Sequence, residues 1–95
     1  MDKRKIEGMK KKLARLQAEL AALGPLMRGS IVRIGTRNKQ FYFSLNKDKK
    51  TRLIYLGEGR EPIARGYSRN YKRLLEIVEE MTLINLDLLK NDVVT

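Results

Sequence analysis

Residues 6–25 read IEGMKKKLARLQAELAALGP, and this stretch decides the fold. Its apolar residues recur at alternating spacings of three and four, at Ile6, Met9, Leu13, Leu16, Leu20 and Leu23. That spacing is the a/d seam of a coiled-coil helix. Asp2 can cap its start. Gly24-Pro25 ends it, because Gly accepts the left-handed conformation and Pro cannot continue a helix. The pattern predicts a helix over residues 3–23.

Three short runs of β-branched and aromatic residues follow and predict strands. They occupy residues 30–34, 40–45 and 51–56. The segments between them are rich in Gly, Asn, Asp and Lys, which is typical of hairpin loops. We therefore expect a three-stranded antiparallel meander over residues 30–57.

An irregular connection and a second helix are predicted after the strands. Gly57, Gly59, Pro62 and Gly66 favour the irregular connection over residues 58–67. Ser68 is a good N-cap, and a wide apolar face predicts a helix over residues 68–91. Such a face can contact two neighbours, so we expect the C-terminal helix also to offer a homodimer contact.

The two predicted helices have apolar seams of equal length, and a compact meander between them returns the chain to its starting point. We therefore expect them to pair antiparallel as a coiled-coil-like hairpin. The predicted fold class is α+β, with residues 1–95 forming a single domain. Its order is a long helix, the three-stranded sheet and a second long helix.

The composition excludes several classes of function. The 95 residues include 21 Lys or Arg against 11 Asp or Glu, a net charge of +10, with no His and no Cys. Thiol and imidazole chemistry are therefore absent, and we expect no enzyme, metal, cofactor or small-molecule substrate. No apolar run approaches the ~20 residues of a membrane span. We expect a cytoplasmic binding protein without a membrane partner.

The charge is unevenly distributed. Residues 28–73 hold 13 Lys or Arg and three acids, whereas residues 74–95 hold one Lys and five acids. Antiparallel pairing would set Lys10–Lys12 and Arg15 beside Glu76, Glu79 and Glu80, and Lys3–Lys5 towards Asp87 and Asp92. The N-terminal basic run is therefore interpreted as the counter-charge of the acidic helix rather than as a nucleic-acid arm. The excess positive charge then belongs to the sheet.

Strand alternation predicts the two faces of the sheet. One would pack on the helices with Val32, Ile34, Phe41, Phe43, Leu45, Leu53 and Tyr55. The other would show Arg33, Gln40, Tyr42, Ser44, Arg52 and Ile54. The candidate nucleic-acid-binding residues are Arg33, Arg37, Lys39, Tyr42, Lys47, Lys49, Lys50 and Arg52. Cations suit phosphates, and Tyr42 could stack on a base.

These observations favour a non-catalytic nucleic-acid-binding module, with DNA favoured over RNA. The alternative is an adaptor or inhibitor whose basic face docks an acidic protein. Lysines that only solubilise the sheet and guard its edges would leave the same pattern. Peripheral membrane binding through the first helix fits less well, because its Leu seam lacks Trp and Phe.

The chain resembles a family of short bacterial and archaeal proteins catalogued as a domain of unknown function. The shared pattern covers about residues 13–89 and includes the Leu23–Ser30 junction, the Phe41–Leu45 strand, Lys50-Thr51-Arg52 and Tyr71–Leu74. Many members carry a cysteine cluster between the first two strands, where this chain has Gly35–Lys39. The resemblance therefore implies no metal here, and it implies an association with mobile elements. The chain is also similar at the level of fold to the arm-binding domains of tyrosine recombinases, which read DNA with a three-stranded sheet.

Overall fold

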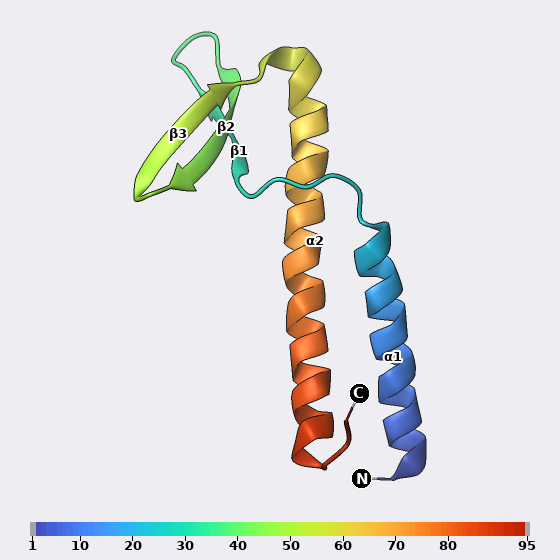
Figure 1. Ribbon diagram of the computed structural model, residues 1–95. Coiled ribbons are helices and arrows are strands. Elements are labelled where there is room, and N and C mark those ends of the chain that lie inside the picture. The colour runs from blue at the N-terminus through green and yellow to red at the C-terminus, as the bar shows by residue number, and fades with distance from the viewer. Residues whose placement is uncertain (1, 95) are drawn as a thin grey trace. The chain divides into compact units, whose positions relative to one another are not determined.

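The computed structural model describes residues 2–94 and confirms the α+β class (Figure 1). Its elements are α1 (Lys3–Ala22), β1 (Ser30–Ile34), β2 (Gln40–Lys47), β3 (Lys50–Tyr55) and α2 (Gly57–Lys90). The three strands form one antiparallel sheet in the order β1-β2-β3, as predicted. No helix within residues 2–94 is long and apolar enough to span a membrane.

The chain divides into two compact units where a single domain was expected. The helical unit comprises residues 1–23 and 73–95, and the sheet unit comprises residues 24–72. Helix α2 contributes residues to both units. Each unit has its own buried side chains.

In the helical unit, α1 lies antiparallel to the C-terminal half of α2 (Figure 1). Asp2 caps α1 as predicted, because its Oδ1 accepts a hydrogen bond of 2.7 Å from the Arg4 amide. Leu16 of the predicted seam is buried, as are Ile77 and Leu88 of α2. Burial of these apolar side chains is the main favourable contribution to this hairpin.

The ion pair that links α1 to α2 involves Arg73 of α2 and not the lysines of α1. Arg73 of α2 donates to Glu19 of α1, with Nη2 2.7 Å from Oε1, and also lies 3.7 Å from a Glu80 oxygen. Among residues 2–94, the lysines of α1 form no ion pair within 4 Å, so the expected pairing of Lys10–Lys12 with the glutamates is not present as direct contacts. The planar Arg fork fits a carboxylate closely. Exposed lysines gain little from pairing, since they lose hydration and side-chain freedom.

The core of the sheet unit forms between the sheet and the first turns of α2. Phe43, Leu56 and Ala64 are buried there, and Met27, Ile31, Phe41 and Leu45 pack around them. Helix α2 therefore begins at Gly57, and the irregular connection predicted over residues 58–67 is helical. Pro62 is the sixth residue of α2, beyond the first four amides that lack a partner within a helix, so it costs the helix one hydrogen bond to the Glu58 carbonyl. Packing of Ala64 on Phe43 outweighs the low helix propensity of the glycines.

The segment that enters β1 is held to α2 by three hydrogen bonds. The Met27 amide donates to the Tyr67 carbonyl at 3.2 Å, and Asn70 Nδ2 donates to the Pro25 carbonyl at 2.8 Å. Ser68, expected to cap a helix, instead lies inside α2 and donates from Oγ to the Gly29 carbonyl at 2.9 Å. The start of β1 is therefore fixed against the middle of α2.

Gly29 is required at that junction. It has a φ of 139°, and a Cβ there would lie 2.6 Å from the Phe43 ring and 2.7 Å from the Ser44 carbonyl. We predict that Gly29→Ala destabilises the protein by about 3 kcal/mol or more, since it adds backbone strain and an overlap in the core. Chemical denaturation followed by tyrosine fluorescence measures this.

Gly59→Ala is the control for that variant. Gly59 lies in the same unit, within a helix, and a Cβ there would meet nothing within 4 Å. This variant should keep or slightly raise stability, because Ala has the higher helix propensity. Equal losses in both variants would contradict the packing assigned to Gly29.

The pair between Glu19 and Arg73 predicts a dependence on pH. Hydrogen bonds from Arg73 lower the pKa of the Glu19 carboxyl below its ordinary value. A lowered pKa in the folded state stabilises the fold above the ordinary carboxyl pKa, and this contribution is lost as pH falls through the lowered pKa. As the pH is lowered from 7 into the acid range, the melting temperature of the parent should therefore fall further than that of Glu19→Gln. If the stabilities of the two proteins fell equally with pH, the stabilising ion pair between Glu19 and Arg73 would be contradicted.

Candidate nucleic-acid interface

Nearly all of the net charge lies in the sheet unit. Residues 24–72 contain twelve Lys or Arg and three acids, a net of +9, whereas the helical unit carries a net of +1. The acidic residues of α2 thus balance the basic residues of α1 in net charge, although within residues 2–94 the lysines of α1 form no direct ion pair with them. The uneven distribution read from the sequence holds between the two compact units. A concentrated positive field attracts polyanions and speeds their association.

Strand register corrects the predicted faces of the sheet. Phe43 lies opposite Ile31 in β1 and Ile54 in β3, so these residues share the core face. By alternation Arg33 and Arg52 also lie on that face, opposite Phe41 and Leu45. The residues predicted to face the core were correct for β2, whereas in β1 and β3 the opposite set of residues faces it. A shift of one residue moves every side chain of a strand to the other face.

The two arginines are therefore at the margin of the core face and not beside Tyr42. The guanidinium of Arg33 lies 5.6 Å from the centre of the Phe41 ring, a cation–π contact. Both arginines remain exposed. The single contact face that was predicted to combine Arg33, Tyr42 and Arg52 is divided between two sides of the sheet.

The opposite face of the sheet is apolar and aromatic. Tyr42 lies between Val32 and Tyr55, and the two tyrosine rings meet edge to face, with centroids 5.7 Å apart. Leu53 and Tyr55 are each 50% exposed on this side. We call this surface, formed by Val32, Ile34, Tyr42, Leu53 and Tyr55, the open face. Tyr42 is half-buried and Tyr55 exposed, and such aromatic side chains can stack on nucleobases, which present a π-face whatever their sequence.

The predicted loop cations lie at the two ends of β2. Arg37 and Lys39 are in the connection before it, and Lys47, Lys49 and Lys50 surround the turn after it; all are exposed. Asp48 and Lys49 have φ of 53° and 62°, which is the conformation of a two-residue hairpin turn. An eight-residue strand is about 26 Å long. The cations therefore form two groups at opposite ends of the sheet, a distance that spans several phosphates of one strand.

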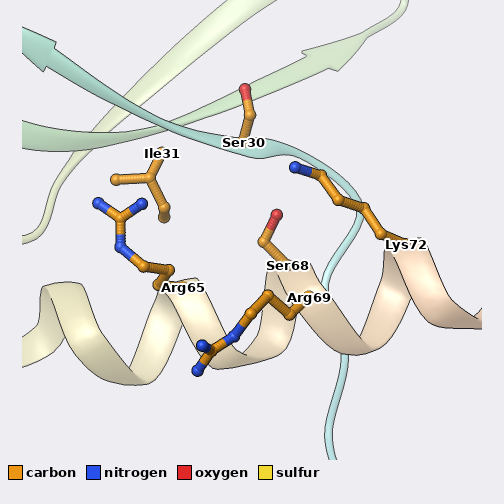
Figure 2. A pocket seen from close by; sticks show the side chains of 6 residues that line it. All are labelled: Ser30, Ile31, Arg65, Ser68, Arg69 and Lys72. Carbon is orange, nitrogen blue, oxygen red and sulfur yellow. The ribbon is translucent and has the colours of Figure 1, made fainter.

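A small cavity between β1 and α2 holds further cations that the sequence prediction missed. It has a volume of about 200 Å³ and is lined by Ser30, Ile31, Arg65, Ser68, Arg69 and Lys72. Arg65, Ser68 and Lys72 of α2 are spaced by three and four positions, so they share one helix face, and Arg69 follows Ser68 at the edge of that face. In Figure 2, Lys72 extends towards Ser30 and Arg65 towards Ile31, whereas the Arg69 guanidinium points away from the strand. We call this site the junction pocket.

The chemistry of the junction pocket suits a tetrahedral oxyanion. Lys72 supplies a point charge, and Arg65 is partly neutralised by its ion pair with Glu61, whereas the Ser30 hydroxyl points away from α2 (Figure 2). Sequence reasoning missed the pocket because Arg65 was assigned to an irregular segment. The spacing of Arg65, Ser68 and Lys72 would have indicated a common face had the helix been extended.

Comparison of the chain with protein-family models, with curated proteins and with solved structures gives no match. Within residues 2–94, no three His, Cys, Asp or Glu side chains gather in a way that could hold a metal ion. The function must therefore be inferred from the chain's own residues.

Proposed function

We propose that the protein is a non-catalytic nucleic-acid-binding module, with DNA as the preferred form, and that its sheet unit makes the contact. The observation that carries this proposal is the net charge of +9 within residues 24–72. Phosphate neutralisation by Lys and Arg releases counter-ions and supplies most of the affinity of such proteins. A cytoplasmic location and an association with mobile elements belong to the same proposal.

The proposed contacts differ from those expected from the sequence. Lys39, Lys47 and Lys49 would contact phosphates along the sheet, and Lys72 would hold one phosphate at the junction pocket. Tyr42 and Tyr55 on the open face would stack on an unpaired base. Arg33 and Arg52 lie on the other side of the sheet and would act chiefly through their charge.

Salt dependence tests the proposal. With about five phosphates neutralised, the affinity for duplex DNA should fall with salt at a log–log slope of about −4 to −5. Fluorescence anisotropy with duplex DNA, single-stranded DNA and RNA probes measures the slope and the preferred form. Absence of binding to every probe at low salt would refute the proposal.

Lys72→Gln tests the junction pocket within that proposal. Loss of one phosphate contact should reduce the salt slope by about 1 and weaken binding several-fold for every probe sequence. The control Lys10→Gln removes the same charge from the exposed surface of α1 in the helical unit. Equal effects of the two substitutions would show that only net charge matters and that the pocket does not hold a phosphate.

A second candidate function is favoured by the open face. Ile34, Leu53 and Tyr55 are exposed there, and an apolar surface bordered by lysines also suits an acidic protein partner. Affinity capture from lysate with and without nuclease distinguishes the two functions. Partners that persist after nuclease and are lost in Leu53→Asp would support the adaptor, whereas loss of all partners with nuclease would support nucleic acid.

A further inference from the structure

The outer edge of β3 has no neighbouring strand. The sheet order β1-β2-β3 places β3 at one edge, where it pairs with β2 alone. The other edge strand, β1, borders α2, because Ser30 and Ile31 line the junction pocket together with residues of that helix. Every residue of β3 is exposed. We call this side of β3 the free edge, and it is open to a further strand.

The register of the β2–β3 hairpin determines which backbone groups point outward at the free edge. The Leu56 amide donates to the Phe41 carbonyl at 3.0 Å, in register with the paired residues of β2 and β3. The direction of hydrogen bonding alternates along an antiparallel strand, so the even-numbered residues of β3 direct their amides and carbonyls to β2. The odd-numbered residues direct theirs away from the sheet, and these are Thr51, Leu53 and Tyr55.

The two rows of side chains on β3 differ in chemistry. Leu53 and Tyr55 lie on the open face, and each is 50% exposed. Lys50 and Arg52 lie on the other side of the sheet and are also exposed. A strand added at the free edge would lay one row of its side chains beside the apolar residues and the other row beside the cations. A strand in which apolar residues alternate with acidic ones matches both rows.

We propose that the free edge of β3 binds an extended acidic peptide, with acidic and apolar residues in alternation, as a fourth strand antiparallel to β3. In strand addition, main-chain hydrogen bonds supply affinity and the alternate side chains supply specificity. The antiparallel direction is favoured because it is slightly more stable per residue than the parallel one. This site goes beyond the nucleic-acid contact, and it gives the acidic-partner candidate a definite binding mode.

The charge of the sheet unit favours an acidic peptide over a second copy of the chain. Residues 24–72 carry a net charge of +9, so pairing two β3 strands edge to edge would bring two such units together. Cationic side chains on an edge strand commonly protect it against self-association. Lys50 and Arg52 supply that protection here. The same two charges attract carboxylates, so they select between the two occupants.

The test uses the full chain and a fluorescent peptide of sequence Glu-Val-Glu-Val-Glu-Val-Glu. Anisotropy is measured at about 0.15 M salt, where attraction between distant exposed charges is screened. Two further peptides carry N-methyl groups, one on two valine amides and the other on two inner glutamate amides. In the antiparallel strand, the valines share the side of Leu53 and direct their amides to β3, whereas the glutamate amides point to solvent. Methylated valines should therefore weaken binding about ten-fold or more, and methylated glutamates less than about two-fold.

Leu53→Pro tests the free edge from the side of the protein. Proline is tolerated on an edge strand where the amide faces solvent, so circular dichroism should show a retained fold. Leu53→Val is the matched control, because it keeps the outward amide. Leu53→Pro should weaken the unmethylated peptide about ten-fold, and Leu53→Val less than about two-fold. Both variants should bind DNA as the parent does, since neither removes a cation.

The outcomes for the peptide site and for nucleic acid are separate. Failure of the parent to bind the unmethylated peptide would overturn the inference, whether or not the parent binds DNA. Equal affinities of the two methylated peptides would overturn strand addition. That comparison uses only the parent, so it stands even if Leu53→Pro does not fold. A loss confined to the methylated glutamates would overturn the antiparallel direction.

Discussion

The close approach of Gly29 to the ring of Phe43 determines how the sheet unit is assembled. Because Gly29 has no Cβ and a φ of 139°, β1 can begin directly against the aromatic side chain of β2. Its carbonyl then lies 2.9 Å from the hydroxyl of Ser68 in the interior of α2. This contact brings Ser30 to the helix face that carries Lys72. The junction pocket therefore exists because a glycine lies at the start of the first strand.

The division of charge has a physical consequence for the sheet unit. Its net charge of +9 within 49 residues repels itself and destabilises the compact state, whereas the helical unit is nearly neutral. A polyanion that binds only the folded sheet unit would relieve this repulsion and stabilise it by mass action. The same charges that weaken the free unit thus provide the driving force for the binding we propose.

The regular patterns of the sequence predicted the elements well. The heptad seam and Gly24-Pro25 located α1, and the β-branched runs located all three strands in the right order. The start of α2 was missed because Gly59, Pro62 and Gly66 argue locally against helix, whereas burial of Ala64 on Phe43 depends on a contact distant in sequence. Local propensity does not include that contact.

The candidate site was harder to predict than the fold. In β1, Ile31 and Arg33 alternate with Val32 and Ile34, so both faces carry apolar residues and the pattern does not fix the phase. Register with Phe43 decides it and separates Arg33 from Tyr42. Net charge indicates which segments attract each other but not which side chains meet, so the pair between Arg73 and Glu19 was not predicted. The junction pocket could not be predicted either, because residues 58–67, which include Arg65, were expected to be irregular and not helical.

The central claim is that the sheet unit, and not the basic helix α1, binds nucleic acid. Amide chemical-shift mapping of the full chain during titration with a short DNA duplex and with a single strand tests it most directly. Shifts are expected within residues 24–72, including Ser30 and Lys72, with the amides of residues 3–15 unchanged. Shifts concentrated in residues 3–15, or no shifts at low salt, would contradict it.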